Sequence, residues 1–153
     1  MRDMRRSDRT INTEETFRVL QEGEYGVLST VGPDNQPYGV PVSFCIIENS
    51  IYFHCAVEGH KIDNVTHNPK VSFCVIGKTC VLPDKFATKY ESAIIFGLLT
   101  EALDDEKQKA LEGLLHKYSK EYFNEGLKYI TALNEKTRVF KIAIDTMTGK
   151  ARK

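Results

Sequence analysis

One stretch of the sequence, residues 51–69, combines basic side chains with the start of a helix. Its first part alternates as a strand does, and after Gly59 the spacing of apolar residues becomes helical. His60 and Lys61 therefore fall in the first helical turn, where free backbone N–H groups and the helix dipole favour an anion. Because Lys61 adds a positive charge and Asn64 lies on the same side of the helix, the stretch predicts a phosphate-binding site.

The same residues have other interpretations. A Gly-His-Lys sequence after a strand can be a solvated helix start without a ligand, and the sequence leaves both possibilities open at this point. A zinc site made by His54, Cys55, His60 and His67 is disfavoured, because the adjacent residues His54 and Cys55 point to opposite faces of a strand. We therefore expect no metal site.

The composition suits one compact domain. The 153 residues are 41% hydrophobic and 27% charged, which is enough for one core and too little for two. We expect a single domain over residues 1–153, with residues 1–10 as a basic N-terminal arm and residues 146–153 as a polar tail.

The balance of charge limits the partners. The chain has 21 basic and 21 acidic residues, so it lacks the net positive field that holds nucleic acid or an anionic membrane. No apolar run follows the charged N-terminus, so we expect neither a signal peptide nor a spanning helix, and a cytoplasmic location. The four cysteines have irregular spacing without a C-x-x-C pair, which predicts reduced, mostly buried thiols.

Periodicity predicts a mainly β protein with peripheral helices (α+β). The expected strands cover residues 25–31, 38–46, 51–55, 71–76, 90–102 and 140–144. The expected helices cover residues 12–23, 60–68, 104–118 and 123–133. Hairpin connections between such strands are typical of a small antiparallel barrel, closed or split.

Two of these strands have unusual features. Pro41 cannot donate to a ladder, so its strand is expected at a sheet edge or a bulge, and Gly39 would let another molecule approach the backbone. An edge strand protected against aggregation is the equally acceptable alternative. The strand over residues 90–102 is apolar on both faces, which suits a barrel wall that meets either a second subunit or an internal helix.

An ordered series of motifs runs through nearly the whole chain and carries a family resemblance. These motifs are Met4-Arg5-Arg6, Tyr38-Gly-Val-Pro-Val42, Tyr52-Phe-His-Cys-Ala56, Gly59-His-Lys-Ile-Asp-Asn64, Asn68-Pro-Lys-Val-Ser-Phe73, Tyr90-Glu-Ser92 and Thr148-Gly-Lys150. Together they resemble the nitroimidazole-resistance (Nim) group of flavin proteins, within the pyridoxamine 5'-phosphate oxidase-like FMN-binding split-barrel superfamily.

The resemblance implies a homodimer that holds two FMN molecules in grooves between its subunits. It places the phosphate at His60 and Lys61, with Asn64 nearby, where the residues themselves favour an anion. It places the isoalloxazine ring along a wall made by the residues Val40, Pro41, Val42, His54, Cys55 and Ala56, with Tyr90 and Ser92 of the partner closing the groove.

The function implied is an FMN-dependent reductase of small electron-poor organic compounds such as nitroimidazoles, supplied by a reduced nicotinamide or another donor. His54 is the candidate for positioning substrate or supplying a proton, and a histidine hydrogen-bonded inside the barrel is the alternative. The alternative functions are a non-catalytic module that binds flavin or haem, and a purely structural dimer.

Two departures from the related families matter. The chain has Phe86-Ala-Thr88 where the Nim group often has a second threonine after the phenylalanine. The arginine-rich motifs of true pyridoxamine phosphate oxidase are missing, so oxidation of vitamin B6 is not expected.

Overall fold

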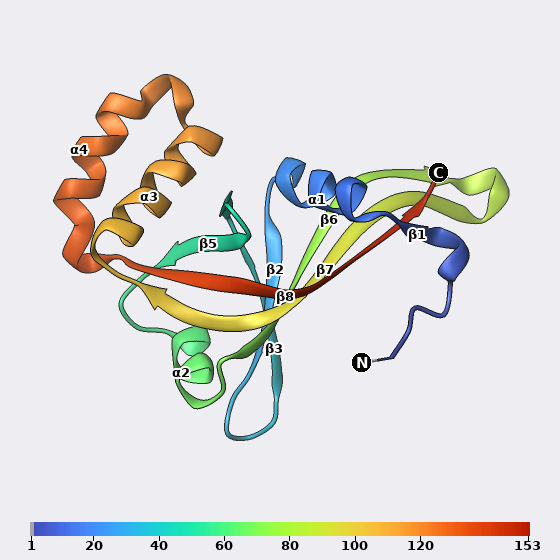
Figure 1. Ribbon diagram of the computed structural model, residues 1–153, viewed down its shortest axis with the longest axis horizontal. Helices are drawn as coiled ribbons and strands as arrows, with labels where there is room; N and C mark the ends of the chain where they lie inside the picture. The colour runs from blue at the N-terminus through green and yellow to red at the C-terminus, as the bar shows by residue number, and fades with distance from the viewer. Residues whose placement is uncertain (1) are drawn as a thin grey trace.

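The computed structural model describes residues 2–153 and is built around one antiparallel sheet. The strands are β1 (Thr10–Ile11), β2 (Gly26–Val31), β3 (Pro37–Val42), β4 (Cys45–Ile47), β5 (Ser50–Cys55), β6 (Lys70–Leu82), β7 (Ala87–Ala102) and β8 (Arg138–Arg152). The helices are α1 (Thr13–Glu22), α2 (His60–His67), α3 (Asp104–Tyr118) and α4 (Phe123–Leu133). The expected antiparallel, mainly β architecture is confirmed (Figure 1).

The sheet is a split barrel rather than a closed one. Its strand order is β3-β2-β6-β7-β8-β5-β4, so β3 and β4 form the two edges although they follow each other in the chain. Ser43 and Phe44 alone connect them, and Phe44 is fully buried. The sheet therefore curls so that its two edge strands are joined by a connection of two residues. Among residues 2–153, these two strands form no backbone ladder with each other.

The break at Ser43 and Phe44 corrects the expectation of one strand over residues 38–46. The backbone N–H of Phe44 donates to the Tyr118 hydroxyl at 3.0 Å, and this hydroxyl donates to the carbonyl of Glu24 at 2.5 Å. A side chain from the end of α3 thus satisfies the connection, which a local strand pattern cannot reveal.

The sheet has an inner and an outer face along β7. Ala93, Ile95 and Leu99 face inward and are buried in the main core, together with Val19 and Leu20 of α1. The alternating residues of β7 point to the outer face, and 40% of Ile94, 41% of Phe96 and 50% of Leu98 is exposed there. Both faces of this strand are apolar, as its sequence predicts.

The segment expected as a polar tail, residues 146–153, instead continues β8 to Arg152, where it pairs with β7 and β1. Ala151 is buried, and a β-carbon on Gly149 would lie 2.0 Å from Oγ1 of Thr16 in α1. Small residues let the helix lie on this strand, and the threonines and lysines between them conceal the alternation in the sequence.

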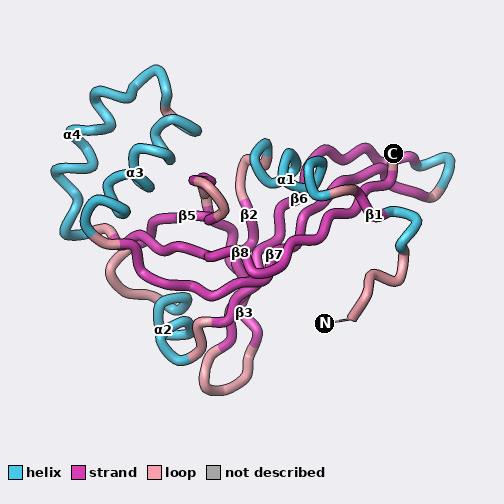
Figure 2. The backbone as a smooth tube through the Cα atoms, in the orientation of Figure 1, coloured by secondary structure: helices cyan, strands magenta, loops and turns pink. Residues whose placement is uncertain are grey.

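One end of the molecule is helical and the other is a β-hairpin. Figure 2 shows the helix pair α3 and α4 at one end of the long axis and the hairpin between β6 and β7 at the other. A second, smaller core joins α3 and α4 to the sheet, with Leu111, Leu114 and Ile130 packed against Tyr52 and Val139. The hairpin extends beyond a bulge between Ile76 and Thr79, and we name residues 79–90 the ribbon.

Candidate functional site

The N-terminus of α2 follows β5 through a glycine in a rare conformation. Gly59 has φ 153° and ψ 171°, a region that side chains rarely adopt, and a β-carbon there would meet nothing within 4 Å. Its carbonyl accepts from the backbone N–H groups of Ile62 and Asp63, each at 3.1 Å. Within residues 2–153 no side chain caps this helix, so the first N–H groups, beside Lys61, remain available for an anion.

His60 is fixed by an aromatic contact with the edge strand β3. Its ring stacks on Tyr38, with ring centroids 4.0 Å apart and planes 26° apart. The stack brings the start of α2 against the same strand that carries Pro41. Tyr38 belongs to a motif of the resemblance but was not predicted as a site residue, because no spacing in the sequence connects positions 38 and 60.

Asn64 is buried between α2 and β2. Its side chain is 3% exposed, and Nδ2 donates to Oγ1 of Thr30 in β2 at 2.9 Å. Gly32 leaves room for it, since a β-carbon at that position would lie 2.4 Å from the Asn64 side-chain oxygen. The side chain therefore anchors α2 to the sheet, and its predicted contact with a phosphate stays a prediction.

The β3 residues predicted for the ring site divide between two faces. Val40 and Val42 pack on the main core, whereas Pro41 and Gly39 face outward and are exposed. Among residues 2–153, β3 pairs with β2 alone, so the backbone groups on its other side have no strand partner there and could bind the polar edge of a ligand.

The predicted residues at the end of β5 lie next to α2. Cys55 packs partly on the main core and burial raises its pKa, whereas Ala56 is exposed. His54 is an exposed residue, and its pKa is lowered, first by partial desolvation of its ring and second by the positive charge of Lys61. At neutral pH His54 is therefore a neutral imidazole beside the basic start of α2.

Tyr90 and Ser92 lie in the first half of β7, on the face that carries Ile94 and Phe96. The end of β7 that joins the ribbon lies away from α2 (Figure 1). Arg9 donates to the Tyr90 hydroxyl at 3.5 Å, and this hydrogen bond and nearby Lys150 lower the pKa of the phenol. Ser92 lines a groove of about 620 Å³, which is within the range of about 300–1,000 Å³ that holds small ligands. The other walls of this groove are Arg2, Asp3, Met4, Ile94, Phe96, Thr148 and Lys150. One protomer thus keeps these residues apart from α2, and their contribution from a partner stays a prediction.

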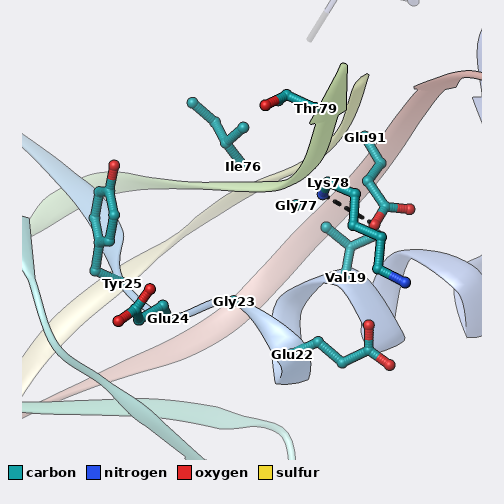
Figure 3. A pocket seen from close by; sticks show the side chains of 10 residues that line it. All are labelled: Val19, Glu22, Gly23, Glu24, Tyr25, Ile76, Gly77, Lys78, Thr79 and Glu91. Atoms are coloured by element: carbon teal, nitrogen blue, oxygen red, sulfur yellow. Dashed lines mark hydrogen bonds between the residues drawn. The ribbon is translucent and has the colours of Figure 1, made fainter. Parts of the chain in front are cut away.

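A further hollow lies at the base of the ribbon, where α1 ends (Figure 3). Its volume is about 400 Å³, and its walls include the acidic side chains of Glu22, Glu24 and Glu91. The Glu91 carboxylate already has hydrogen-bond partners, since it accepts from the Arg18 side chain at 2.7 Å and from the Lys78 backbone N–H at 3.2 Å. This hollow has the wrong charge for a phosphate, so it is not the candidate site.

The geometry therefore gives a basic helix N-terminus, an exposed strand edge beside it, and a groove on the outer face. A sequence model of pyridoxamine 5'-phosphate oxidase matches residues 12–151. This chain belongs to the pyridoxamine 5'-phosphate oxidase family. The match spans every strand and helix from α1 to β8 except the last residue of β8. Among curated proteins, none matches the sequence significantly.

Members of this fold have been solved from several bacteria. A proposed 5-nitroimidazole antibiotic resistance protein from Bacteroides thetaiotaomicron VPI-5482 is 22% identical, with a TM-score of 0.76 over 93% of this chain and 86% of the other. A conserved hypothetical protein from Mycobacterium tuberculosis is 17% identical, with a TM-score of 0.82 over 97% and 90%. A FAD-binding protein from Mesorhizobium loti is 22% identical, with a TM-score of 0.67 over 95% and 98%. At these identities the comparisons establish the shared fold.

Two searches of the described residues concern other kinds of site. No helix within residues 2–153 is both long and apolar enough to cross a membrane. In the same part of the chain, no group of three or more histidine, cysteine or acidic side chains is placed to hold a metal ion.

Proposed function

We propose that the protein binds FMN as a homodimer and reduces small electron-poor organic compounds, with nitroimidazoles as the first class to test. The observation that carries the proposal is the start of α2, where Lys61 and His60 stand at a helix N-terminus that no side chain of the described residues caps. A terminal phosphate is the group that such a site suits best. The family and the FAD-binding neighbour support a flavin as the rest of the ligand.

The residues present fit a flavin. Gly59 leaves open space in front of the helix, and the exposed edge of β3 offers unpaired backbone groups to a planar polar ring. When bound, FMN supplies the electron transfer chemistry, and the protein positions it. FMN is preferred to FAD because its phosphate is terminal and can enter the first turn of α2 directly.

His54 has a defined part in this proposal. Its lowered pKa favours the neutral ring, which can orient a substrate through one hydrogen bond. A phosphate bound beside Lys61 would offset the positive charge and raise the pKa of His54 toward neutrality. Proton supply by His54 would therefore depend on the occupied site.

The second subunit is proposed for a physical reason. Ile94, Phe96 and Leu98 form an exposed apolar row on the outer face of β7, and such a row is usually covered in a stable assembly. Beside this row lie Tyr90 and Ser92, so a partner facing it would complete the groove that α2 and β3 begin.

The first test is the visible absorption spectrum of the purified protein, with mass spectrometry of the material that acid releases. We expect flavin bands and FMN, with weaker uptake of FAD by protein stripped of its ligand. A colourless protein that takes up neither flavin would refute the proposal, and a Soret band would indicate a haem-binding module instead. Activity is tested by comparing how fast nitroimidazoles reoxidise the reduced bound flavin and free flavin, and equal rates would refute the reductase.

A further inference from the structure

The tip of the ribbon carries an aromatic side chain, Phe86, that is almost fully exposed. Phe86 is 97% exposed and has φ 47°, in the left-handed region that bulky residues avoid. Glycine or asparagine would suit this turn better. Val81, on the opposite strand of the ribbon, is 69% exposed. A two-stranded ribbon with apolar side chains in water is marginal alone, so these residues point to a contact elsewhere.

The base of the ribbon is firmly held. In Figure 3 the dashed line joins Lys78 to Glu91 across the bulge of β6, and the other carboxylate oxygen of Glu91 accepts from Arg18 of α1. Gly77 also packs closely on Glu91, because a β-carbon at position 77 would lie 2.6 Å from Cγ of Glu91. The ribbon therefore projects from a fixed base, which lowers the entropic cost of docking its tip.

At the opposite end of the molecule, α3 and α4 enclose a groove that can receive such a tip. Its volume is about 440 Å³, and Leu103 and Ile130 give it apolar walls. This volume lies within the range of about 300–1,000 Å³ that holds small ligands, so it has room for one aromatic ring. Leu103 is 60% exposed at the start of α3 although it is a large apolar residue.

The two ends also complement each other in charge. The ribbon carries Lys85 and Lys89 against Asp84, and at its base Lys78 lies beside Glu91. On the groove, Asp104 is a wall residue with Asp105 next to it in the chain, whereas the wall residue Lys107 already donates to the backbone carbonyls of Asn134 and Thr137. Among residues 2–153, neither these aspartates nor Lys85 and Lys89 of the ribbon form an ion pair. Opposite charges at the rim of a contact favour the correct pairing of surfaces.

We infer that the ribbon is a clasp between two copies of this chain, in which Phe86 of each protomer enters the groove between α3 and α4 of the other. The inference rests on the proposed homodimer. The ribbon and the helix pair lie at opposite ends of the long axis (Figure 1). If two copies lie antiparallel about a two-fold axis perpendicular to that long axis, the ribbon of each copy lies beside the helix pair of the other. The clasp also fixes where Tyr90 and Ser92, at the root of the ribbon, meet the partner's flavin groove.

Disulfide trapping tests the contact directly. Cys80, the exposed native cysteine of the ribbon, is first changed by Cys80→Ser. In that background, Phe86→Cys combined with Thr131→Cys, on the wall of the groove, should give a covalent dimer under mild oxidation. The matched control combines Phe86→Cys with Glu14→Cys at the exposed start of α1, and it should remain uncrosslinked.

Phe86→Asn is the second measurement. Asparagine tolerates the left-handed region, so the ribbon turn should form at least as well as before. Loss of a buried aromatic anchor should still raise the dimer dissociation constant by about tenfold or more. Sedimentation at a series of protein concentrations measures that constant.

The outcomes separate the two proposals. A protein that is dimeric and binds FMN, yet gives no specific crosslink or the same dissociation constant after Phe86→Asn, would overturn the clasp alone. A protein that is monomeric at all concentrations would overturn the clasp together with the proposed homodimer. Specific trapping with a weakened Phe86→Asn dimer is the result expected.

Discussion

Two helices of this protein, α1 and α2, begin in opposite ways. Asn12 caps α1, with its side-chain oxygen accepting from the Glu15 backbone N–H at 2.8 Å, and acidic residues occupy the first turn. Gly59 begins α2 without a side chain. The first turn of α2 contains one acid, Asp63, together with Lys61, which adds positive charge where the helix dipole is already positive. The chain caps α1 by itself, whereas no side chain of residues 2–153 caps α2, which is why we propose an external anion there.

The largest effect should follow removal of the charge at α2. Lys61→Ala removes a charge-assisted contact worth about 1.5–3 kcal/mol, so the dissociation constant for FMN should rise by about 10- to 100-fold. The free energy of unfolding without ligand should stay the same or increase slightly. Fluorescence titration with FMN measures the change, and Lys70→Ala, an exposed lysine at the start of β6, is the control. Equal constants for the two variants would remove the distinction between the helices.

A second prediction concerns the backbone that opens the α2 site. Gly59→Ala forces a side chain into φ 153°, which should lower the free energy of unfolding by about 1–3 kcal/mol. Gly39→Ala is the control, because an added β-carbon there meets its nearest atom at an ordinary 3.5 Å. Urea unfolding of both variants measures the difference. A tolerated alanine at position 59 would show that the turn before α2 is not restricted to glycine.

At α1 the expected effect is smaller and concerns stability alone. Asn12→Ala removes the cap and should cost about 1 kcal/mol of unfolding free energy. The dissociation constant for FMN should not change, because α1 packs on the sheet away from α2 (Figure 1). Urea unfolding and FMN titration of the same samples test both statements, and weakened binding would mean that the two helix starts are coupled.

The smallest effect is on the titration of His54. Lys61→Ala should raise the pKa of His54, while desolvation keeps it below its ordinary value near 6.5. Because the folded pKa is lowered, the unfolded chain binds more protons, so stability should fall as the pH decreases through about 6.5. This loss should be smaller in Lys61→Ala. Proton NMR measures the pKa, with His54→Gln to assign the resonance, and an unchanged pKa would show that Lys61 does not act on this ring.

Much of the fold could be predicted from the sequence because local periodicity determined it. The alternation of Ile94, Ile95 and Phe96 gave both faces of β7, and the change of period after Gly59 gave α2. The end of β8 could not be predicted, because Thr146 and Lys150 look polar until Gly149 is seen against α1. Local sequence contains no record of such a contact.

The candidate site was predictable to a different degree. The prediction of an anion at the start of α2 follows from residue types alone, since Lys61 and the helix N-terminus favour the same charge. The stack of Tyr38 on His60 and the bond from Asn64 to Thr30 join segments far apart in the chain, so they needed the folded structure. The flavin contacts, the homodimer and the single domain over residues 1–153 stay predictions.

The position of β8 in the sheet has a consequence for how the chain folds. It pairs with β7, β5 and β1, including Thr10 with Lys150, yet it comes last of the strands in sequence. The sheet therefore cannot join its two halves until the ribosome has released this strand. Such long-range pairing slows folding and exposes unpaired strand edges of β5 and β7 in the meantime. During synthesis, the edges of β5 and β7 that β8 covers should stay unpaired until β8 has been made.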